Sequence, residues 1–291
     1  MSNIIQKIID NIRGKIFALP SMAKRFQDYK QIESYHTLIL GSSHMDCGYL
    51  TGVKELNMAS PSQDLYYSYN LYKILNNSEL KNVIISYSVF SAGDFLIKSQ
   101  LAKIAIIFKL LYNIPYQSEE LAKAKKLYQH EKRYKKLIDK YLKKIASKEI
   151  CKPVNLEELQ RNIVETCSQN QLDENEIEKI KIRAQSHYKI CKKEVKQTNY
   201  LIDLAKDTLN NNQNLTIVLP PVNSIYKNAI PESKTMYEDL YKICENYKHI
   251  KIVNLYDSEL FNDSDFGDGD HVNTCGAIKI TKAIKGSINN F

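Results

Sequence analysis

The 291-residue sequence lacks three patterns that would each assign it to a class of protein. Its six cysteines include no Cys-x-x-Cys pair, which argues against a zinc cluster or a disulfide framework and favours a reducing cytoplasm. No run reaches the roughly 18 apolar residues of a membrane-spanning helix, because Lys103 and Lys109 interrupt the best candidate, residues 101–114. The absence of a Walker-type loop and of a dinucleotide glycine pattern weakens a phosphoryl- or glycosyl-transfer function.

The first 13 residues also lack the charged, then apolar, then small-residue order of a signal peptide. Their isoleucines instead follow helical spacing and predict an amphipathic helix that packs on the core. Binding to a membrane surface or to a partner is the alternative for this segment. The isoleucines are Ile4, Ile5, Ile8, Ile9 and Ile12.

Short apolar runs alternate with helical patterns along most of the chain. A hydrophobic content of 43% and a charged content of 25% are typical of a globular domain. Strands that alternate with helices predict a three-layer, doubly wound, mostly parallel sheet of five strands, with sites at the carboxyl ends of the strands. The predicted strands are 36–40, 53–58, 82–86, 215–220 and 250–255, and helices are predicted at 63–75, 200–209, 233–247 and 276–288.

Residues 96–212 contain no glycine and no strand pattern, and they carry 24 basic and 15 acidic residues. They predict a basic helical insertion that divides an α/β core into residues 1–95 and 213–291. Lysines interleaved with glutamates are typical of solvated helix faces, so we expect no nucleic acid partner. The insertion is predicted to be a lid or an arm that docks a protein partner. Its predicted helices are 119–146, 155–167 and 174–210.

Two motifs near opposite ends of the chain suggest one reaction. The run Thr37-Leu38-Ile39-Leu40 ends in Gly41-Ser42-Ser43-His44, and a strand that ends in Gly-x-Ser can present a serine hydroxyl at the sheet edge. Asp268 precedes His271 by three residues, ahead of the last helix, and can orient that histidine as a general base. Together these motifs indicate a Ser-His-Asp hydrolase or acyltransferase. The rival nucleophile is Ser42, and the rival carboxylate is Asp270.

These motifs resemble the SGNH (GDSL-type) hydrolase superfamily. Its first block is Gly-Asp-Ser, here Gly41-Ser42-Ser43, and its last block is Asp-x-x-His. The wider pattern, including Asn57-Met58-Ala59, resembles the branch found near bacterial cell-surface polysaccharide genes. The resemblance implies a flavodoxin-like fold in which Ser43 is the nucleophile, His271 the base and Asp268 the orienting carboxylate.

The resemblance also implies an oxyanion hole, and here the sequence departs from the family. The backbone N–H groups of Ser43 and of Ala59 or Ser60 would bind the oxyanion. The family's third block supplies an asparagine, but residues 87–91 contain none. Losing one such donor costs roughly 100- to 1000-fold in turnover. The side chains that could substitute are those of Ser88, Ser91 and Asn223.

Four neighbouring residues have more than one interpretation. His44 is either a pocket residue or a satisfied surface histidine, and Asn57 either positions the oxyanion turn or satisfies backbone groups. Cys47 and Cys275 lie near the two motifs, but free cysteines are more often small buried hydrophobes than nucleophiles. The acidic run at 263–268 has its glycine one position too early for a calcium loop, so we expect no metal.

The sequence therefore predicts a serine-dependent esterase or O-acyltransferase. The family resemblance implies O-acetyl groups on a carbohydrate as substrates and a cytoplasmic role in cell-surface glycan biosynthesis. No cofactor is expected, although a transferase would use an acyl donor such as acetyl-CoA. The alternative is a catalytically silent SGNH-like binding module in a glycan-assembly complex, and a weaker one is a transferase with a phosphate-bearing sugar donor.

Overall fold

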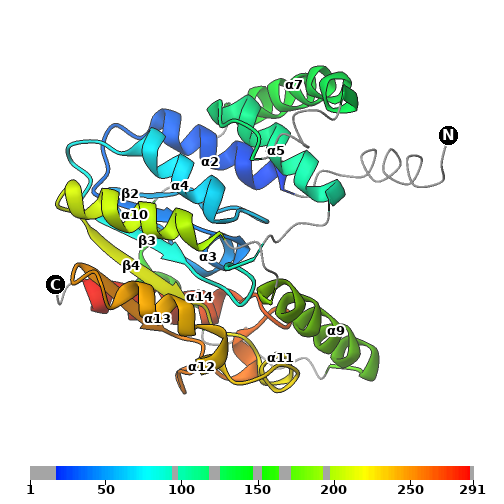
Figure 1. Cartoon of the computed structure of the whole chain (residues 1–291), viewed down its shortest axis with the longest axis vertical. Coiled ribbons are helices and arrows are strands. Elements are labelled where there is room, and N and C mark those ends of the chain that lie inside the picture. The colour runs from blue at the N-terminus through cyan, green and yellow to red at the C-terminus, as the bar shows by residue number, and fades with distance from the viewer. Residues whose placement is uncertain are drawn as a thin grey trace.

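The computed structural model describes residues 18–93, 98–117, 125–146, 153–163, 172–192 and 197–288. Its centre is a five-stranded, entirely parallel sheet with the strand order β2-β1-β3-β4-β5, which confirms the predicted doubly wound α/β fold (Figure 1). All five strands occur where the sequence predicts them. They are β1 (Thr37–Leu40), β2 (Glu55–Asn57), β3 (Asn82–Ser86), β4 (Asn214–Leu219) and β5 (Ile250–Asn254).

Alternate residues of the central strands point into two separate apolar layers. Leu38 and Val83 belong to the larger cluster, whereas their neighbours Ile39 and Ile84 belong to the smaller one. Because both faces are covered, these strands are apolar without interruption, as buried parallel strands are. Helices α2 (Leu19–Gln31), α4 (Leu65–Leu75) and α10 (Thr198–Asn210) cover the first face, and α3 (Ser43–Gly48) and α14 (Thr274–Ile288) cover the second.

The helices differ from the sequence predictions in several places. Helix α2 was not predicted, although it buries Met22 and Ala23 against the core. The predicted helix 233–247 is divided into α12 (Ser233–Met236) and α13 (Glu238–Cys244), and the predicted helix 174–210 into α9 (Glu174–Cys191) and α10. The N-terminal residues predicted to be helical lie outside the described residues. The remaining helices are α5 (Lys98–Tyr112), α7 (Lys125–Ala146), α8 (Leu156–Ile163) and α11 (Ser224–Asn228).

The helices of the predicted insertion contact different parts of the core. Helix α5 packs against α2 and α4, α7 packs against α2, and α10 packs against α4 and β4. Helix α9 instead contacts α11, and it lies at the opposite end of the view from α5 and α7 (Figure 1). The boundaries at residues 95 and 212 stay predictions.

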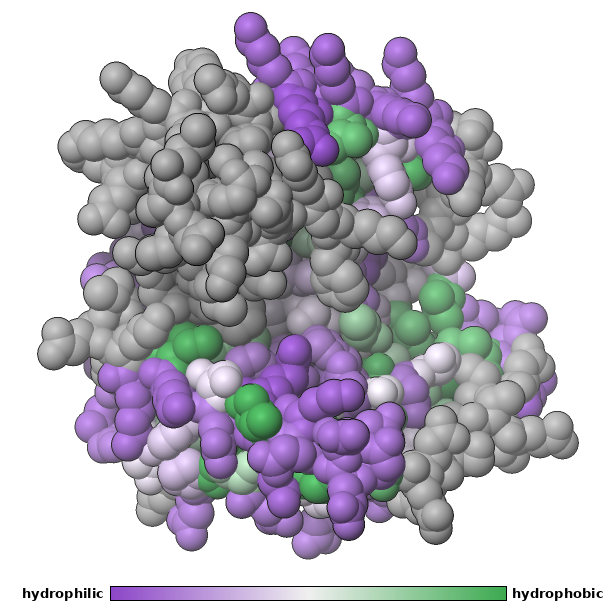
Figure 2. Space-filling model, turned by 90° about the vertical axis from the view of Figure 1, so that its right-hand side faces the viewer, coloured by the Kyte–Doolittle hydropathy of each residue, from purple (hydrophilic) through white to green (hydrophobic). Residues whose placement is uncertain are grey.

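On the face that Figure 2 shows, hydrophilic side chains predominate and apolar side chains form small, separate groups. Among the helices in the described ranges, none combines the length and the hydropathy that crossing a bilayer demands.

Gly41 occupies a position that other residues cannot adopt without strain. Its φ is +118°, and a Cβ atom there would lie 2.1 Å from Ser86 Oγ and 2.9 Å from the Ser86 backbone nitrogen. We therefore expect Gly41→Ala to lower the free energy of unfolding by about 2–5 kcal/mol, measured by thermal or urea denaturation. Gly286→Ala is the matched control, since a Cβ there meets no atom within 4 Å. Equal stability of both variants would contradict this account of the turn.

Candidate active site

The carboxyl edge of the sheet brings together the two ends of the chain. Ser43 is the first residue of α3, directly after β1, and His271 lies in the loop between β5 and α14. The Ser43 Oγ atom is 2.7 Å from the His271 Nε2 atom, although 228 positions separate these residues. Both side chains are partly exposed, so a ligand can reach the hydroxyl. This distance is within the range of a serine that a histidine base activates.

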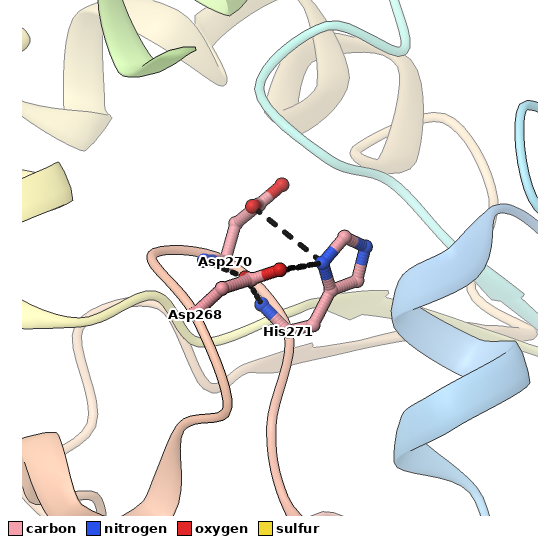
Figure 3. A group of neighbouring side chains, drawn as sticks. All are labelled: Asp268, Asp270 and His271. Atoms are coloured by element: carbon pink, nitrogen blue, oxygen red, sulfur yellow. Dashed lines mark hydrogen bonds and ion pairs between the residues drawn. The ribbon is translucent and has the colours of Figure 1, made fainter. Parts of the chain in front are cut away.

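Asp268 orients the His271 ring, as Figure 3 shows. Its Oδ2 and Oδ1 atoms are 2.8 Å and 3.1 Å from His271 Nδ1. An ionised carboxylate only accepts hydrogen bonds, so Nδ1 carries the proton and Nε2 has the lone pair that accepts from Ser43. The backbone N–H groups of Asp270 and His271 also donate to Asp268 Oδ1, at 2.9 Å and 2.8 Å, and fix the turn.

The charges of this pair favour an imidazole that readily accepts a proton. Burial acts to lower the pKa of His271, but its hydrogen bond to Asp268 and the charges of Asp270 and Asp268 outweigh burial and raise the pKa. Burial acts to raise the pKa of Asp268, but the hydrogen bond and charge of His271 hold it below the usual carboxyl value. His271 can therefore take the serine proton, and Asp268 stays ionised.

Asp270 forms a second, buried layer behind this pair. Its side chain is 0% exposed, and its Oδ1 and Oδ2 atoms accept from Nε and Nη2 of Arg183 at 2.6 Å and 3.1 Å. Its carboxylate lies 3.7 Å from His271 Nδ1, which is beyond hydrogen-bond range. Asp270, the rival carboxylate, therefore makes no hydrogen bond to Nδ1. Asp268 makes this hydrogen bond, as predicted.

His44 is buried, so its interpretation as a surface histidine is wrong. Its Nδ1 atom lies 2.9 Å from Ser42 Oγ and 3.0 Å from Ser88 Oγ, and its Nε2 atom lies 3.4 Å from Asp270 Oδ2. The ring stacks on that of His271 with centroids 5.3 Å apart. Burial lowers the pKa of His44, although Asp270 opposes this shift, and the ring is neutral.

Ser42 is excluded as the nucleophile by the same contacts. Its hydroxyl donates to His44, whose other ring nitrogen faces Asp270, so these residues also form a Ser-His-Asp array. However, Ser42 and His44 are only 3% and 5% exposed, and a substrate cannot reach this buried array.

Two predicted oxyanion donors are already engaged within the fold. The Ala59 N–H donates to Asn57 Oδ1 at 3.0 Å, and the Ser60 N–H donates to the Gly41 carbonyl at 3.1 Å. Asn57 also donates from Nδ2 to the Met45 carbonyl at 3.2 Å, so it satisfies backbone groups of the turn. The roles predicted for Ala59 and Ser60 are therefore corrected. Ser43 remains a donor candidate, because the first N–H groups of a helix have no intrahelical acceptor.

The predicted substitutes for the missing asparagine are mostly structural. The Ser88 hydroxyl contacts His44, and Ser91 Oγ accepts from the Ser88 N–H at 2.8 Å. Asn223 is buried and caps α11, since its Oδ1 accepts from the Tyr226 N–H at 2.8 Å. The Asn223 N–H donates to the Gly269 carbonyl at 3.0 Å and so supports the loop that carries His271.

Sequence reasoning missed two residues of α9 and one helix cap. Arg183 binds Asp270, and His187 donates or accepts at 2.7 Å with the Tyr226 hydroxyl. Their spacing of four residues places both on one helix face, and this spacing was the only local sequence pattern that linked them. Asn273 caps α14 by accepting from the N–H groups of Cys275 and Gly276.

A metal ion does not fit the acidic residues of the site. Asp268, Asp270 and His271 each offer a ligand atom within 4.8 Å of the others. However, the Arg183 guanidinium already binds both oxygens of Asp270, and its charge would repel a cation there.

Neither of the two cysteines near the motifs, Cys47 and Cys275, offers a thiol nucleophile. Burial and the neighbouring Asp46 raise the pKa of Cys47 to about 11, so its thiolate is not formed near neutral pH. Cys275 is disulfide-bonded. The prediction of reduced cysteines is wrong for Cys275, and the argument for a reducing compartment loses this support.

Comparisons with known proteins give little further information. No protein-family model matches the chain, and no curated protein matches it. Among solved structures, the chain is similar to one described as "a putative platelet activating factor from Streptococcus pneumonia". The identity is 10% and the TM-score 0.47, over 99% of this chain and 100% of the other. A likeness this distant indicates neither family nor activity.

Proposed function

We propose that this protein is a serine-dependent acyl-ester hydrolase or O-acyltransferase of the SGNH type. The observation that carries the proposal is the line of three groups in which Asp268 binds His271 Nδ1 and His271 Nε2 binds Ser43 Oγ, at 2.8 Å and 2.7 Å. Ser43 and His271 are partly exposed at the carboxyl edge of a parallel sheet, where ligands of this architecture bind.

The proposed reaction has two steps, the acylation of Ser43 and its deacylation. Ser43 Oγ attacks the ester carbonyl while its proton moves to His271 Nε2, and Asp268 stabilises the imidazolium. The tetrahedral intermediate collapses, the C–O bond of the alcohol breaks, and the alcohol leaves with the proton of His271. Water or a sugar hydroxyl then gives a proton to His271 and attacks the acyl carbon. The bond from that carbon to Ser43 Oγ breaks, and His271 returns the proton to this oxygen, which regenerates Ser43 and releases the acid or the new ester.

The substrate class follows from the family resemblance of the motifs. We propose O-acetyl groups on a carbohydrate of a cell-surface glycan as the acyl esters. A transferase would take the acyl group from a donor such as acetyl-CoA, and a hydrolase would pass it to water. The choice between the two depends on how well the bound substrate excludes water from the acyl-serine.

A catalytically silent binding module is the second candidate, and the engaged oxyanion donors favour it. The N–H groups of Ala59 and Ser60 donate within the fold, and residues 87–91 offer no asparagine. Each missing donor costs roughly 100- to 1000-fold in turnover, so the remaining donors leave the acyl-transfer reaction slow.

Covalent labelling separates the two candidates. We expect the wild type to hydrolyse p-nitrophenyl acetate and to form one adduct with a fluorophosphonate probe, mapped by peptide mass spectrometry to Ser43. Ser42→Ala should keep the adduct because the Ser42 hydroxyl contacts His44 rather than His271, whereas Ser43→Ala should lose it. Folded wild-type protein that gives neither turnover nor adduct would favour the binding module.

A further inference from the structure

The buried Asp270 carboxylate is the centre of a charge cluster, in which the side chain of its partner Arg183 is 43% exposed. Besides its two bonds to Arg183, it lies 3.4 Å from His44 Nε2, 3.7 Å from His271 Nδ1 and 3.8 Å from His187 Nδ1. Burial acts to raise the pKa of Asp270, but the hydrogen bonds and positive charge of its neighbours hold it well below the usual carboxyl value. An ionised carboxylate thus lies beside three imidazoles. If the negative charge of Asp270 were not balanced, the pKa of each imidazole would be higher.

Arg183, a residue of α9, balances the negative charge of Asp270. Helix α9 packs closely on the loop of His271. A Cβ atom added at Gly269 would lie only 2.6 Å from Ile180 Cγ2 of this helix. One turn beyond Arg183, His187 contacts the Tyr226 hydroxyl of α11. Burial lowers the pKa of His187 to about 3, so it adds no positive charge of its own.

The two carboxylates near His271 consequently have different roles. Asp268 is half exposed and accepts the Nδ1 hydrogen bond, whereas Asp270 is buried and paired with a guanidinium. Without Arg183, the unpaired Asp270 would compete with Asp268 for His271 and would also favour a charged His44. A charged His44 would have a proton on Nδ1, and this nitrogen would lose the lone pair that faces the hydroxyls of Ser42 and Ser88.

We propose that Arg183, acting through the buried carboxylate of Asp270, is a positioning residue for the Ser43–His271 pair. Helix α9 then completes the active site instead of serving only as a lid or docking arm. The proposal rests on the proposed function for its kinetic readout, but its charge argument can be measured without turnover.

The test concerns the protonation of His271, which several elements influence. Asp268 and Asp270 face it from its own loop, and His44 faces it from α3. Arg183 and His187 of α9 act on it as charged or titratable neighbours. The Tyr226 hydroxyl of α11 adjoins the same cluster.

In the test, Arg183→Gln is expected to lower kcat/KM for p-nitrophenyl acetate about 10- to 100-fold near pH 7. The acid limb of its pH profile should move up by about one pH unit, because Asp270 is no longer balanced. The double variant Arg183→Gln/Asp270→Asn removes both charges. It should return the acid limb to its wild-type pH and restore most of the wild-type kcat/KM. Lys181→Gln, an exposed charge change on the same helix, is the control and should leave both unchanged.

Two results would overturn the proposal. One is an Arg183→Gln variant with the wild-type rate and pH profile. The other is a folded double variant that is no better than Arg183→Gln. If Arg183→Gln does not fold, Asp270→Asn is the single variant tested instead. Its acid limb should lie at lower pH than that of the wild type, and the limb of the double variant should lie at the wild-type pH.

The proposed function can fail separately from this inference. If the wild type shows no turnover, NMR titration of the histidine side chains gives the readout, with His271 assigned from a His271→Asn variant. The His271 pKa should rise in Arg183→Gln and return in the double variant. An unchanged His271 pKa would reject the positioning role of Arg183, whatever the protein catalyses.

Discussion

Ser43→Ala and His271→Ala are each expected to lower kcat for ester hydrolysis by at least about a thousandfold, and the double variant should lose no more than either. The reason is that the 2.7 Å contact makes the two side chains one unit: the hydroxyl is a weak nucleophile without the imidazole, and the imidazole has no proton to take without the hydroxyl. Residues that act as a unit have non-additive effects.

Steady-state hydrolysis of p-nitrophenyl acetate by the four proteins measures this coupling. His36→Ala is a matched control, since His36 is a partly exposed histidine near Glu79 and away from the sheet edge. It should keep the wild-type rate. Additive losses from Ser43→Ala and His271→Ala would mean that the two residues act in separate steps, and the triad would then be wrong.

The sequence predicted the strands and the two ends of the site because both depend on local patterns. The five apolar runs are buried on both faces of the sheet, so burial itself produced the signal that identified them. Gly41 and Ser43 were recognisable because a strand must turn sharply before a serine can face outward. Asp268 and His271 lie in one turn, and a spacing of three residues is enough to predict their hydrogen bond.

Other parts of the site depend on contacts that no short pattern encodes. Arg183 is one of many basic residues in a Lys-rich stretch, and only the packing of α9 on Gly269 brings it to Asp270. The resemblance of Asn57-Met58-Ala59 to the SGNH pattern implied that the Ala59 N–H could bind the oxyanion. Whether such a group is free depends on Asn57, whose Oδ1 accepts the Ala59 N–H while its Nδ2 donates to the Met45 carbonyl of α3.

Asp268→Asn should lower kcat about a thousand- to ten-thousandfold, whereas Asp270→Asn should lower it no more than about tenfold. An amide at position 268 can donate to Nδ1, which favours the tautomer with the proton on Nε2. That nitrogen could then no longer accept from Ser43, and the base would be lost although the geometry is kept. Asp270 makes no hydrogen bond to Nδ1, since 3.7 Å separates the two, and its loss changes only the surrounding charge.

The pH profiles of the two variants provide the measurement. The pKa of His271 is raised, and activity requires the neutral ring, so wild-type activity should rise as the pH passes upward through that pKa. Both carboxylates contribute to the raised pKa, so the acid limb should move to lower pH in each variant, while only Asp268→Asn lowers the plateau severely. If Asp270→Asn lowered the plateau as much as Asp268→Asn, the buried carboxylate would be the one that orients His271. The 2.8 Å contact of Asp268 would then be a surface ion pair without a catalytic role.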